Sequence, residues 1–350
     1  MSQRKPKVAV VPGDGIGVEV IAEGVRLIQH LAPDIELEHF DLGAERYLRD
    51  GTTLPDDVFV RWRDEFDAIF LGALGDPRVP SNIHAKEILL GSRFRYDLFI
   101  NQRPIRLLDA RKCPLKGKGP EEVDIMVFRE NTEGVYTGVG GVLKKDTADE
   151  VAQEVCIVTR KGVERIIRAA YEYADKFGKK RVCMSDKSNA MRNVGQLWQK
   201  VWKEVAAEYP HIESRHLYVD VLAMELVRAP ENFDVIVTGN LFGDIITDLG
   251  AILQGGIGLA CSGNIHPGQL GLFEPVHGSA PDIAGQGKAN PMATFLTAGM
   301  MLNQLGRPEL EDRIIAAIRD MLQADETTPE LGGTLTTSQV TDRLLARLDA

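Results

Sequence analysis

The chain has 350 residues, more than one hydrophobic core usually serves, so two domains are the first expectation. Its composition, 44% hydrophobic and 26% charged, is typical of a globular protein and excludes a disordered or fibrous one. The formal net charge of −10 argues against broad electrostatic binding to nucleic acid or to an anionic membrane. An anionic substrate would therefore need a local cluster of arginines.

Targeting signals and paired cysteines are not found in the sequence. The basic start runs directly into residues 8–11 without the apolar run and cleavage site of a signal peptide, so none is expected. No stretch approaches 18 consecutive apolar residues, which predicts no membrane span. Four cysteines show no C-x-x-C spacing and are expected to be reduced thiols of a cytoplasmic protein. They are Cys113, Cys156, Cys183 and Cys261.

Short β-branched runs, glycine turns and amphipathic stretches alternate along the chain, which predicts an open α/β sheet covered by helices. In chain order, the predicted strands are 8–11, 67–71, 124–128, 156–159, 181–185, 216–219 and 234–238. The predicted helices are 18–31, 161–177, 195–209, 224–228, 244–254, 291–305 and 310–324. Residues 107–122 are expected to be a loop, and the glycine-rich stretch 138–149 a projecting hairpin.

The first motif, residues 12–17, reads PGDGIG and lies between a predicted strand and a predicted helix. A glycine-rich turn lets backbone N–H groups approach an anion at a helix N-terminus. The residues that follow Gly17, among them Glu19, do not complete the G-x-G-x-x-G spacing of the dinucleotide fingerprint. A ligand-binding loop and a tight structural turn both remain open.

A stronger signal is a pair of aspartates, Asp244 and Asp248, in the segment GDIITDL with helical spacing. Side chains four residues apart on a helix face the same way, and two like charges there repel unless a cation lies between them. Carboxylate oxygens suit Mg²⁺ or Mn²⁺ better than Zn²⁺. The alternative is a solvated acidic face, but the neighbours are apolar or glycine, which favours a metal site.

Several further polar residues are candidates for an active site, and two of them, Arg129 and Lys187, follow predicted strands, where α/β enzymes place their active groups. Arginines bind carboxylates with two parallel hydrogen bonds, and a lysine beside another cation can act as a base. Taken singly, each of these residues could equally be ordinary surface or core. They are Arg93, Arg103, Arg129, Tyr136 and Lys187.

Residues 274–282 read EPVHGSAPD, a run of turn-forming residues without periodicity. His277 could be a structural histidine, or it could contact an adenine and its ribose. An acidic residue near the ribose would favour NAD, because it accepts from the ribose hydroxyls and repels a 2′-phosphate.

Together, these segments resemble the β-decarboxylating dehydrogenases, which include isocitrate, 3-isopropylmalate, homoisocitrate and tartrate/D-malate dehydrogenases. The resemblance covers nearly the whole chain and is most specific in residues 239–248 (GNLFGDIITD) and 274–282. It implies a two-domain α/β, isocitrate/isopropylmalate dehydrogenase-like fold that is not a Rossmann fold. The implied domains are a discontinuous cofactor-side domain, 1–99 plus 252–350, and a substrate, metal and dimerisation domain, 100–251.

The resemblance also implies a homodimer with shared active sites and a role for each candidate residue. The substrate carboxylates would be held by Arg93, Arg103 and Arg129. The metal, Mg²⁺ or Mn²⁺, would be held by Asp244 and Asp248, with Asp220 from the partner. The acid–base pair would be Tyr136, which protonates C3, and the partner's Lys187, which takes the C2 hydroxyl proton. The NAD site would be lined by His277, Gly278, Ala280, Asp282 and Asn290, and NADP-using relatives carry a lysine at position 282.

The substituent on C3 of the malate decides the substrate, and the residues point in two directions. Leu89 and Leu90 suit an apolar branch. Lys86, which replaces the glutamate typical of isopropylmalate enzymes, would instead suit a third carboxylate, and Ala190 is smaller than the valine that helps enclose an isopropyl group. We expect NAD-dependent oxidative decarboxylation of 3-isopropylmalate to 2-oxoisocaproate, in leucine biosynthesis, with isocitrate, homoisocitrate and tartrate/D-malate as alternatives.

Two other classes of protein compete with this interpretation. A non-catalytic regulatory subunit on the same fold would be expected to lose the tyrosine, the lysine or the metal aspartates, and all are present here. A metal-dependent binding or phosphoester-processing protein could use Asp244 and Asp248 but would leave the Asp282 loop unexplained.

Overall fold

The computed structural model describes residues 4–349, and its contacts divide the chain into two compact units. Unit 1 comprises the described parts of Met1–Leu98 and Ala251–Ala350, with Arg106–Pro120; unit 2 comprises Phe99–Ile105 and Glu121–Gly250. The expected domain of 100–251 would include residues 106–120, which instead pack with unit 1. One reason is Arg111, whose Nη1 donates to Asp325 Oδ2 at 3.2 Å.

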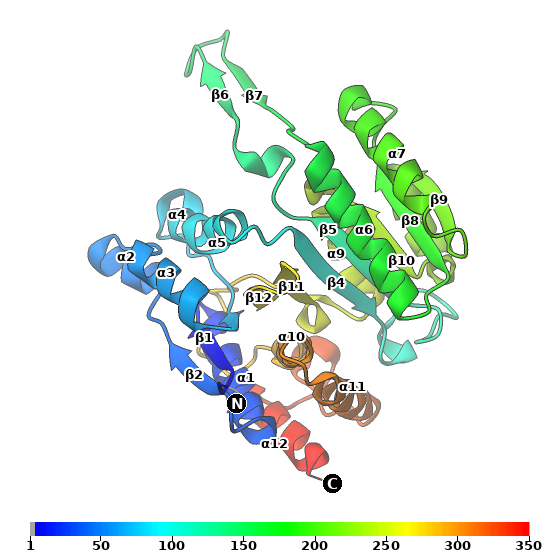
Figure 1. Ribbon diagram of the computed structural model, residues 1–350. Helices are drawn as coiled ribbons and strands as arrows, with labels where there is room; N and C mark the ends of the chain where they lie inside the picture. The colour runs from blue at the N-terminus through cyan, green and yellow to red at the C-terminus, as the bar shows by residue number, and fades with distance from the viewer. Residues whose placement is uncertain (1–3, 350) are drawn as a thin grey trace. The chain divides into compact units, whose positions relative to one another are not determined.

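The described part of unit 1 contains a mostly parallel sheet with the strand order β2-β1-β3-β12-β11 (Figure 1). Only β11 runs antiparallel, to β12. β1 and β3 read KVAVV and AIFL, continuous apolar runs of the kind found in strands buried on both faces. The strands are β1 (Lys7–Val11), β2 (Glu36–His39), β3 (Ala68–Leu71), β11 (Cys261–Ile265) and β12 (Gly271–Pro275).

The helices of unit 1 bury apolar stripes against this sheet and against each other. α1 packs on α10 and α12 through residues such as Val20 and Leu27, and a capping box of Thr336 and Gln339 begins α12. The helices are α1 (Ile16–Leu31), α2 (Ala44–Asp50), α3 (Asp56–Glu65), α4 (Ile83–Ala85), α5 (Gly91–Arg95), α10 (Met292–Gln304), α11 (Pro308–Gln323) and α12 (Thr337–Leu348). Shorter turns are η1 (Pro80–Asn82), the π-helical η2 (Lys86–Leu90), η3 (Ala110–Lys112), η6 (Ile257–Leu259) and η7 (Pro329–Leu331).

Unit 2 contains the strand order β4-β5-β10-β8-β9, in which β5, β10, β8 and β9 run parallel. α6 covers β5, β10 and β8 with Val163, Ile166, Ile167 and Ala170, the three- and four-residue spacing of one helix face. The strands are β4 (Ile100–Arg106), β5 (Asp124–Glu130), β6 (Gly140–Leu143), β7 (Val151–Glu154), β8 (Arg181–Asp186), β9 (Glu213–Tyr218) and β10 (Val235–Thr238). The helices are α6 (Arg160–Lys176), α7 (Arg192–Ala206), α8 (Val219–Arg228) and α9 (Asn240–Leu253), with the short turns η4 (Val135–Thr137) and η5 (Pro230–Asn232).

Most predicted elements are confirmed, and the exceptions have local reasons. The strand predicted at 156–159 is wrong: Ile157 forms only a single bridge with Gly134, because the chain there turns from β7 into α6. The predicted hairpin is present as β6 and β7, which pair antiparallel and extend beyond α6 (Figure 1), but its second strand, β7, lies after the predicted stretch of 138–149. The strand predicted at 216–219 begins earlier, at Glu213, and Val219 already starts α8.

No helix within residues 4–349 has the length and apolar character that crossing a membrane requires.

Candidate active site

The predicted metal aspartates lie on α9, which begins where β10 ends. Asp244 is half-buried and Asp248 is more exposed, and their spacing of four residues puts both on one face of the helix. The pKa of Asp248 is raised, first by loss of hydration and then by the negative charge of Asp244, while Arg103 and Arg129 act in the opposite direction. Two hard carboxylates that repel each other form a donor set that a divalent cation would stabilise.

Arg129, at the end of β5, is 1% exposed and hydrogen-bonded beside this pair. Its Nη1 donates to Asp244 Oδ1 at 2.5 Å, and Nε and Nη2 both donate to Asn240 Oδ1, at 3.0 and 2.8 Å. A Cβ on Gly243 would lie 2.6 Å from Arg129 Cγ, so only glycine lets the arginine pass here. The acceptors Asn240 and Asp244 at one end, and the close approach of Gly243 at the other, therefore fix the direction of the Arg129 side chain.

Arg103 and Tyr136 approach the same carboxylate. Arg103, 7% exposed on β4, donates from Nε to Asn101 Oδ1 at 2.7 Å, and its Nη1 lies 3.4 Å from Asp244 Oδ1. The Tyr136 hydroxyl, in η4, donates to Asp244 Oδ2 at 2.9 Å. The structure thus gathers Arg103, Arg129 and Tyr136 around Asp244, although they come from separate segments of unit 2.

Lys187 and Asp220 form a second cluster in unit 2. Lys187 directly follows β8, and its Nζ donates to Asp220 Oδ2 at 2.6 Å in the first turn of α8. The Lys187 ammonium lowers the pKa of Asp220. Within the part of the chain that the structure describes, no three His, Cys, Asp or Glu side chains could hold a metal ion together. Asp220 therefore does not join Asp244 and Asp248 within one chain.

Arg93, the remaining predicted substrate arginine, belongs to unit 1. It is 4% exposed in α5, and its Nη2 donates to Glu274 Oε1 at 3.1 Å. Glu274, on β12, also accepts from Asn264 Nδ2 at 3.0 Å. The Arg93 guanidinium is therefore held in a fixed direction by a carboxylate rather than extending freely into solvent.

The predicted cofactor residues follow β12 in unit 1. His277 is buried, which lowers its pKa, and its Nδ1 donates to Gly278 O at 3.1 Å while Nε2 has no partner among the described residues. Asn290 is also buried; its Oδ1 accepts from Met292 N at 3.1 Å, and Nδ2 likewise meets no partner in residues 4–349. Asp282 is exposed, and a Cβ on Gly278 would meet no atom within 4 Å. Buried polar atoms without partners beside open backbone fit a polar ligand such as a dinucleotide.

The PGDGIG turn packs against the segment that carries the predicted cofactor residues. Cβ atoms on Gly13 and Gly15 would lie 2.2 Å from Ala73 O and 2.0 Å from Ser279 O, and both glycines have positive φ, 77° and 53°. Ile16 N donates to Ser279 O at 2.8 Å. The glycines are therefore required by close backbone approach.

Sequence reasoning missed several residues that shape these clusters. Asp14 is buried and accepts from Ala44 N at 2.6 Å, Gly75 N at 2.7 Å and His84 Nε2 at 2.8 Å, and so ties the turn to neighbouring segments. Asn240, which orients Arg129, could have been found as a polar residue that directly follows an apolar strand. His84 carries no such signal, because its partner is 70 residues away.

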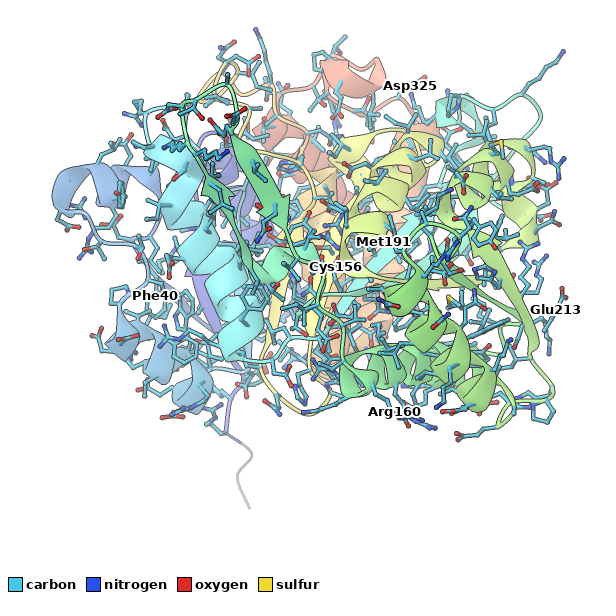
Figure 2. All side chains as sticks on the ribbon, turned by 90° about the horizontal axis from the view of Figure 1, so that it is seen from above. Phe40, Cys156, Arg160, Met191, Glu213 and Asp325 are labelled. Carbon is cyan, nitrogen blue, oxygen red and sulfur yellow. The ribbon has the colours of Figure 1, made fainter. Side chains whose placement is uncertain are left out.

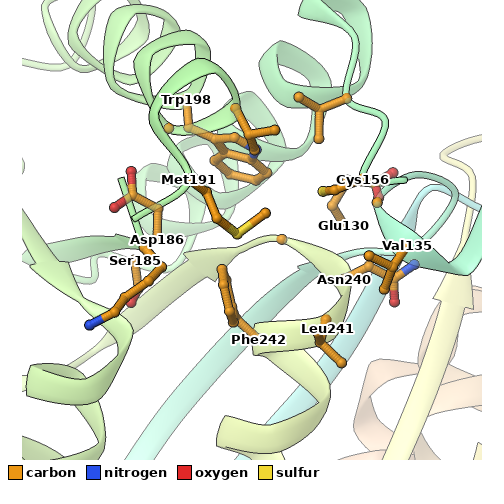
Figure 3. A pocket seen from close by; sticks show the side chains of 16 residues that line it. Glu130, Val135, Cys156, Ser185, Asp186, Met191, Trp198, Asn240, Leu241 and Phe242 are labelled. Atoms are coloured by element: carbon orange, nitrogen blue, oxygen red, sulfur yellow. The ribbon is translucent and has the colours of Figure 1, made fainter. Parts of the chain in front are cut away.

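A small cavity of about 90 Å³ lies beside Lys187 (Figure 3). Its walls are mostly apolar side chains, and neither Arg103 nor Arg129 lines it, so it suits neither a dicarboxylate nor a metal ion. Cys156 and Met191, which both face it, also lie close together in Figure 2. The apolar side chains that line it include Val135, Val158, Met191, Trp198 and Phe242.

An α/β chain that gathers two arginines, a tyrosine and a carboxylate pair in one unit has the groups of an enzyme that acts on small acids. The chain matches the isocitrate/isopropylmalate dehydrogenase family over residues 7–344 and belongs to it. It is accordingly a decarboxylating dehydrogenase, as the resemblance in the sequence implied.

Similar proteins extend over the full length of the chain. The 3-isopropylmalate dehydrogenase of Thermobifida fusca is 47% identical over 354 residues, with 99% of each chain covered. That of Streptomyces griseus is 47% identical over 350 residues, again with 99% of each chain covered. Among solved structures, isocitrate dehydrogenase from Methylococcus capsulatus superposes with a TM-score of 0.91 at 34% identity, covering 99% of this chain and all of that one.

Proposed function

We propose that the protein catalyses the NAD-dependent, Mg²⁺- or Mn²⁺-assisted oxidative decarboxylation of 3-isopropylmalate to 2-oxoisocaproate, in the cytoplasm and as part of leucine biosynthesis. The observation that carries the proposal is the meeting of Arg129, Arg103 and Tyr136 at the Asp244 carboxylate. The full-length similarity to two 3-isopropylmalate dehydrogenases supports this choice of substrate.

Each cluster receives a role in this proposal. Arg103 and Arg129 bind the substrate carboxylates, which replace Asp244 as their partner. Tyr136, whose hydroxyl donates to Asp244, would hand its proton to C3 after CO₂ leaves, and Lys187 would accept the proton of the C2 hydroxyl. When bound, NAD⁺ supplies the hydride acceptor, and the divalent ion supplies Lewis-acid polarisation of the C2 oxygen. The role of Arg93 in substrate binding rests on the family motif alone.

The proposed cofactor and metal ligands follow the sequence assignments. Asp244 and Asp248 would hold the metal together with the partner subunit's Asp220. His277, Gly278, Ala280, Asp282 and Asn290 would line the NAD site. The unpartnered Nε2 of His277 and Nδ2 of Asn290 support a ligand there, and the exposed carboxylate of Asp282 favours NAD over NADP by repelling a 2′-phosphate.

A homodimer is part of the proposal, because one chain offers only two of the three metal carboxylates together. Large apolar side chains on α8 and α9 are exposed: Met224 at 62%, Val227 at 46% and Ile245 at 58%. Exposed apolar faces of this kind mark interaction sites, and a second copy that covers them would bring Lys187 and Asp220 of one chain to the other's metal pair.

Isocitrate is the second candidate substrate, favoured by Lys86. This residue is exposed in η2, where its positive charge would favour a substrate with a third carboxylate. The half-buried Leu89 and Leu90 instead favour a substrate with an apolar branch. The test is NADH absorbance with Mn²⁺, NAD⁺ and a panel of 3-isopropylmalate, isocitrate, homoisocitrate, tartrate and D-malate. The highest kcat/KM is expected with 3-isopropylmalate. A higher kcat/KM with isocitrate would make isocitrate the proposed substrate instead, and no NADH formation with any of the five acids would refute the proposal.

A further inference from the structure

The carboxylate of Asp186, next to Lys187, is buried and has three hydrogen-bond donors from three directions. Asp186 ends β8 and is 5% exposed. Its Oδ1 accepts from His216 Nε2 at 2.8 Å and from Ser188 N at 3.0 Å, and its Oδ2 accepts from Gln199 Nε2 at 3.2 Å. The bond to Ser188 N spans Lys187 and makes a side-chain-closed turn with the lysine at its centre.

The backbone of Lys187 is held on its other side as well. Its carbonyl accepts from Ala190 N at 2.9 Å and from Met191 N at 2.8 Å. The φ and ψ angles of Lys187 are therefore set by hydrogen bonds before and after it. The remaining freedom of the residue lies in its long side chain.

Alternate residues of one segment hold that side chain and the Asp186 carboxylate. His216 and Tyr218 lie on the same side of β9, opposite Met184 and Asp186 in the register, and Asp220 follows in the first turn of α8. His216 binds Asp186, Tyr218 presents its ring 5.9 Å from Lys187 Nζ, and Asp220 pairs with that ammonium at 2.6 Å. The His216 ring is itself held between Trp202 and Tyr218, at centroid distances of 6.2 and 5.1 Å.

We infer that Asp186 and His216 are positioning residues, which hold the Lys187 side chain against Asp220 and keep the Asp186 carboxylate from competing for it. The inference rests on the proposed function, in which Lys187 is the base. Without His216, the Asp186 carboxylate loses its shortest partner and lies one residue from an ammonium that attracts it. Lys187 would then divide its time between two carboxylates and lose its alignment, and a displacement of about 1 Å can cost about 100-fold in rate.

The experiment compares His216→Ala with His216→Gln, whose Nε2 can still donate to Asp186. The matched control is His211→Ala, because His211 forms a similar pair in unit 2, with Asp175 at 2.7 Å, on an exposed surface. The dimeric enzyme is assayed with NAD⁺, Mn²⁺ and the best substrate, with hydrogen or deuterium at C2. Wild type and Lys187→Met are run first. No turnover by wild type would overturn the proposed function, and full activity of Lys187→Met would show that Lys187 is not the base. The inference fails in both cases.

With wild type active and Lys187→Met inactive, His216→Ala is expected to lower kcat about 10- to 100-fold while KM stays within about threefold. The primary isotope effect on kcat should rise, because a misaligned base slows the chemical step; a mere loss of folded enzyme would leave it unchanged. His216→Gln should recover most of kcat and His211→Ala all of it. Unchanged kcat and isotope effect in His216→Ala, or His216→Gln as slow as His216→Ala with a wild-type melting temperature, would overturn the inference.

Gln199→Leu removes the donor to Asp186 Oδ2 and leaves His216 in place. It decides the question if His216→Ala does not fold. A smaller fall in kcat with a raised isotope effect supports the positioning role, and wild-type values for both overturn it.

Discussion

Replacing Asn240 by alanine should weaken both the fold of unit 2 and substrate binding, because Asn240 Oδ1 is the acceptor for two N–H groups of the buried Arg129. The bonds are 3.0 and 2.8 Å long and involve a charged donor, so each contributes about 1.5 kcal/mol at the lower end of the usual range. Asp244 still pairs with Nη1, so the charge is not left alone. The expected loss in the free energy of unfolding is about 3 kcal/mol.

Urea unfolding followed by fluorescence measures this loss, and NADH absorbance measures the accompanying change in kcat/KM. Arg129 in a shifted position should lower kcat/KM by about 100-fold. Asn193→Ala is the matched control, because it removes the same side-chain atoms at an exposed position in the first turn of α7. If Asn240→Ala and Asn193→Ala unfold at the same urea concentration with the same kcat/KM, Asn240 does not orient Arg129.

Three other outcomes are expected. Tyr136→Phe should slow the protonation of C3 that completes decarboxylation more than it slows oxidation, whereas Lys187→Met should abolish both; unchanged steady-state rates in both variants would remove these roles. EDTA should abolish activity and Mn²⁺ restore it, with Asp248→Asn needing more Mn²⁺ for half-maximal rate, and a wild-type requirement in that variant would exclude Asp248 as a ligand. Burial lowers the pKa of His277 from 6.5, so the unfolded chain takes up its proton first and stability is lost as pH falls below about 6.5. Melting temperatures between pH 7 and 5 should therefore fall more in wild type than in His277→Gln, and parallel curves would contradict this.

The pattern of apolar residues was enough to predict β1, β3, β5, β8 and β10, because each of these parallel strands is largely buried and contains a short apolar run. The parallel strands β2 and β12 were missed, since ELEH and GLFEP contain no such run of more than two residues. β4 was missed, since it reads INQRPIR and carries polar residues at buried positions. Asn101 and Arg103 are buried there because they bond one another beside Asp244. The rule that strands are apolar fails where a strand supplies the site.

In the candidate site, too, local sequence patterns predicted some of the contacts and missed others. Asp244 and Asp248 could be predicted as a pair because they lie four residues apart on one helix, and helical geometry alone puts them on the same face. Tyr136 and Asp244 are 108 residues apart, and their hydrogen bond depends on how η4 packs, which no local pattern records. The same holds for Asp14 and His84, which lie 70 residues apart.

If Arg103 and Arg129 bind the substrate as proposed, Asp244 explains how this buried pair is stabilised before the substrate arrives. A buried guanidinium without a partner would cost several kcal/mol, and Asp244 provides that partner for Arg129, at 2.5 Å, and lies 3.4 Å from Arg103. A substrate carboxylate offers the same oxygen geometry, so it can take over the arginines with little net change in their hydrogen bonding. Asp244 would then be freed, beside Asp248, for a cation. In the proposed function, substrate and metal binding would thereby be coupled through one side chain, and by linkage each should raise the affinity for the other equally.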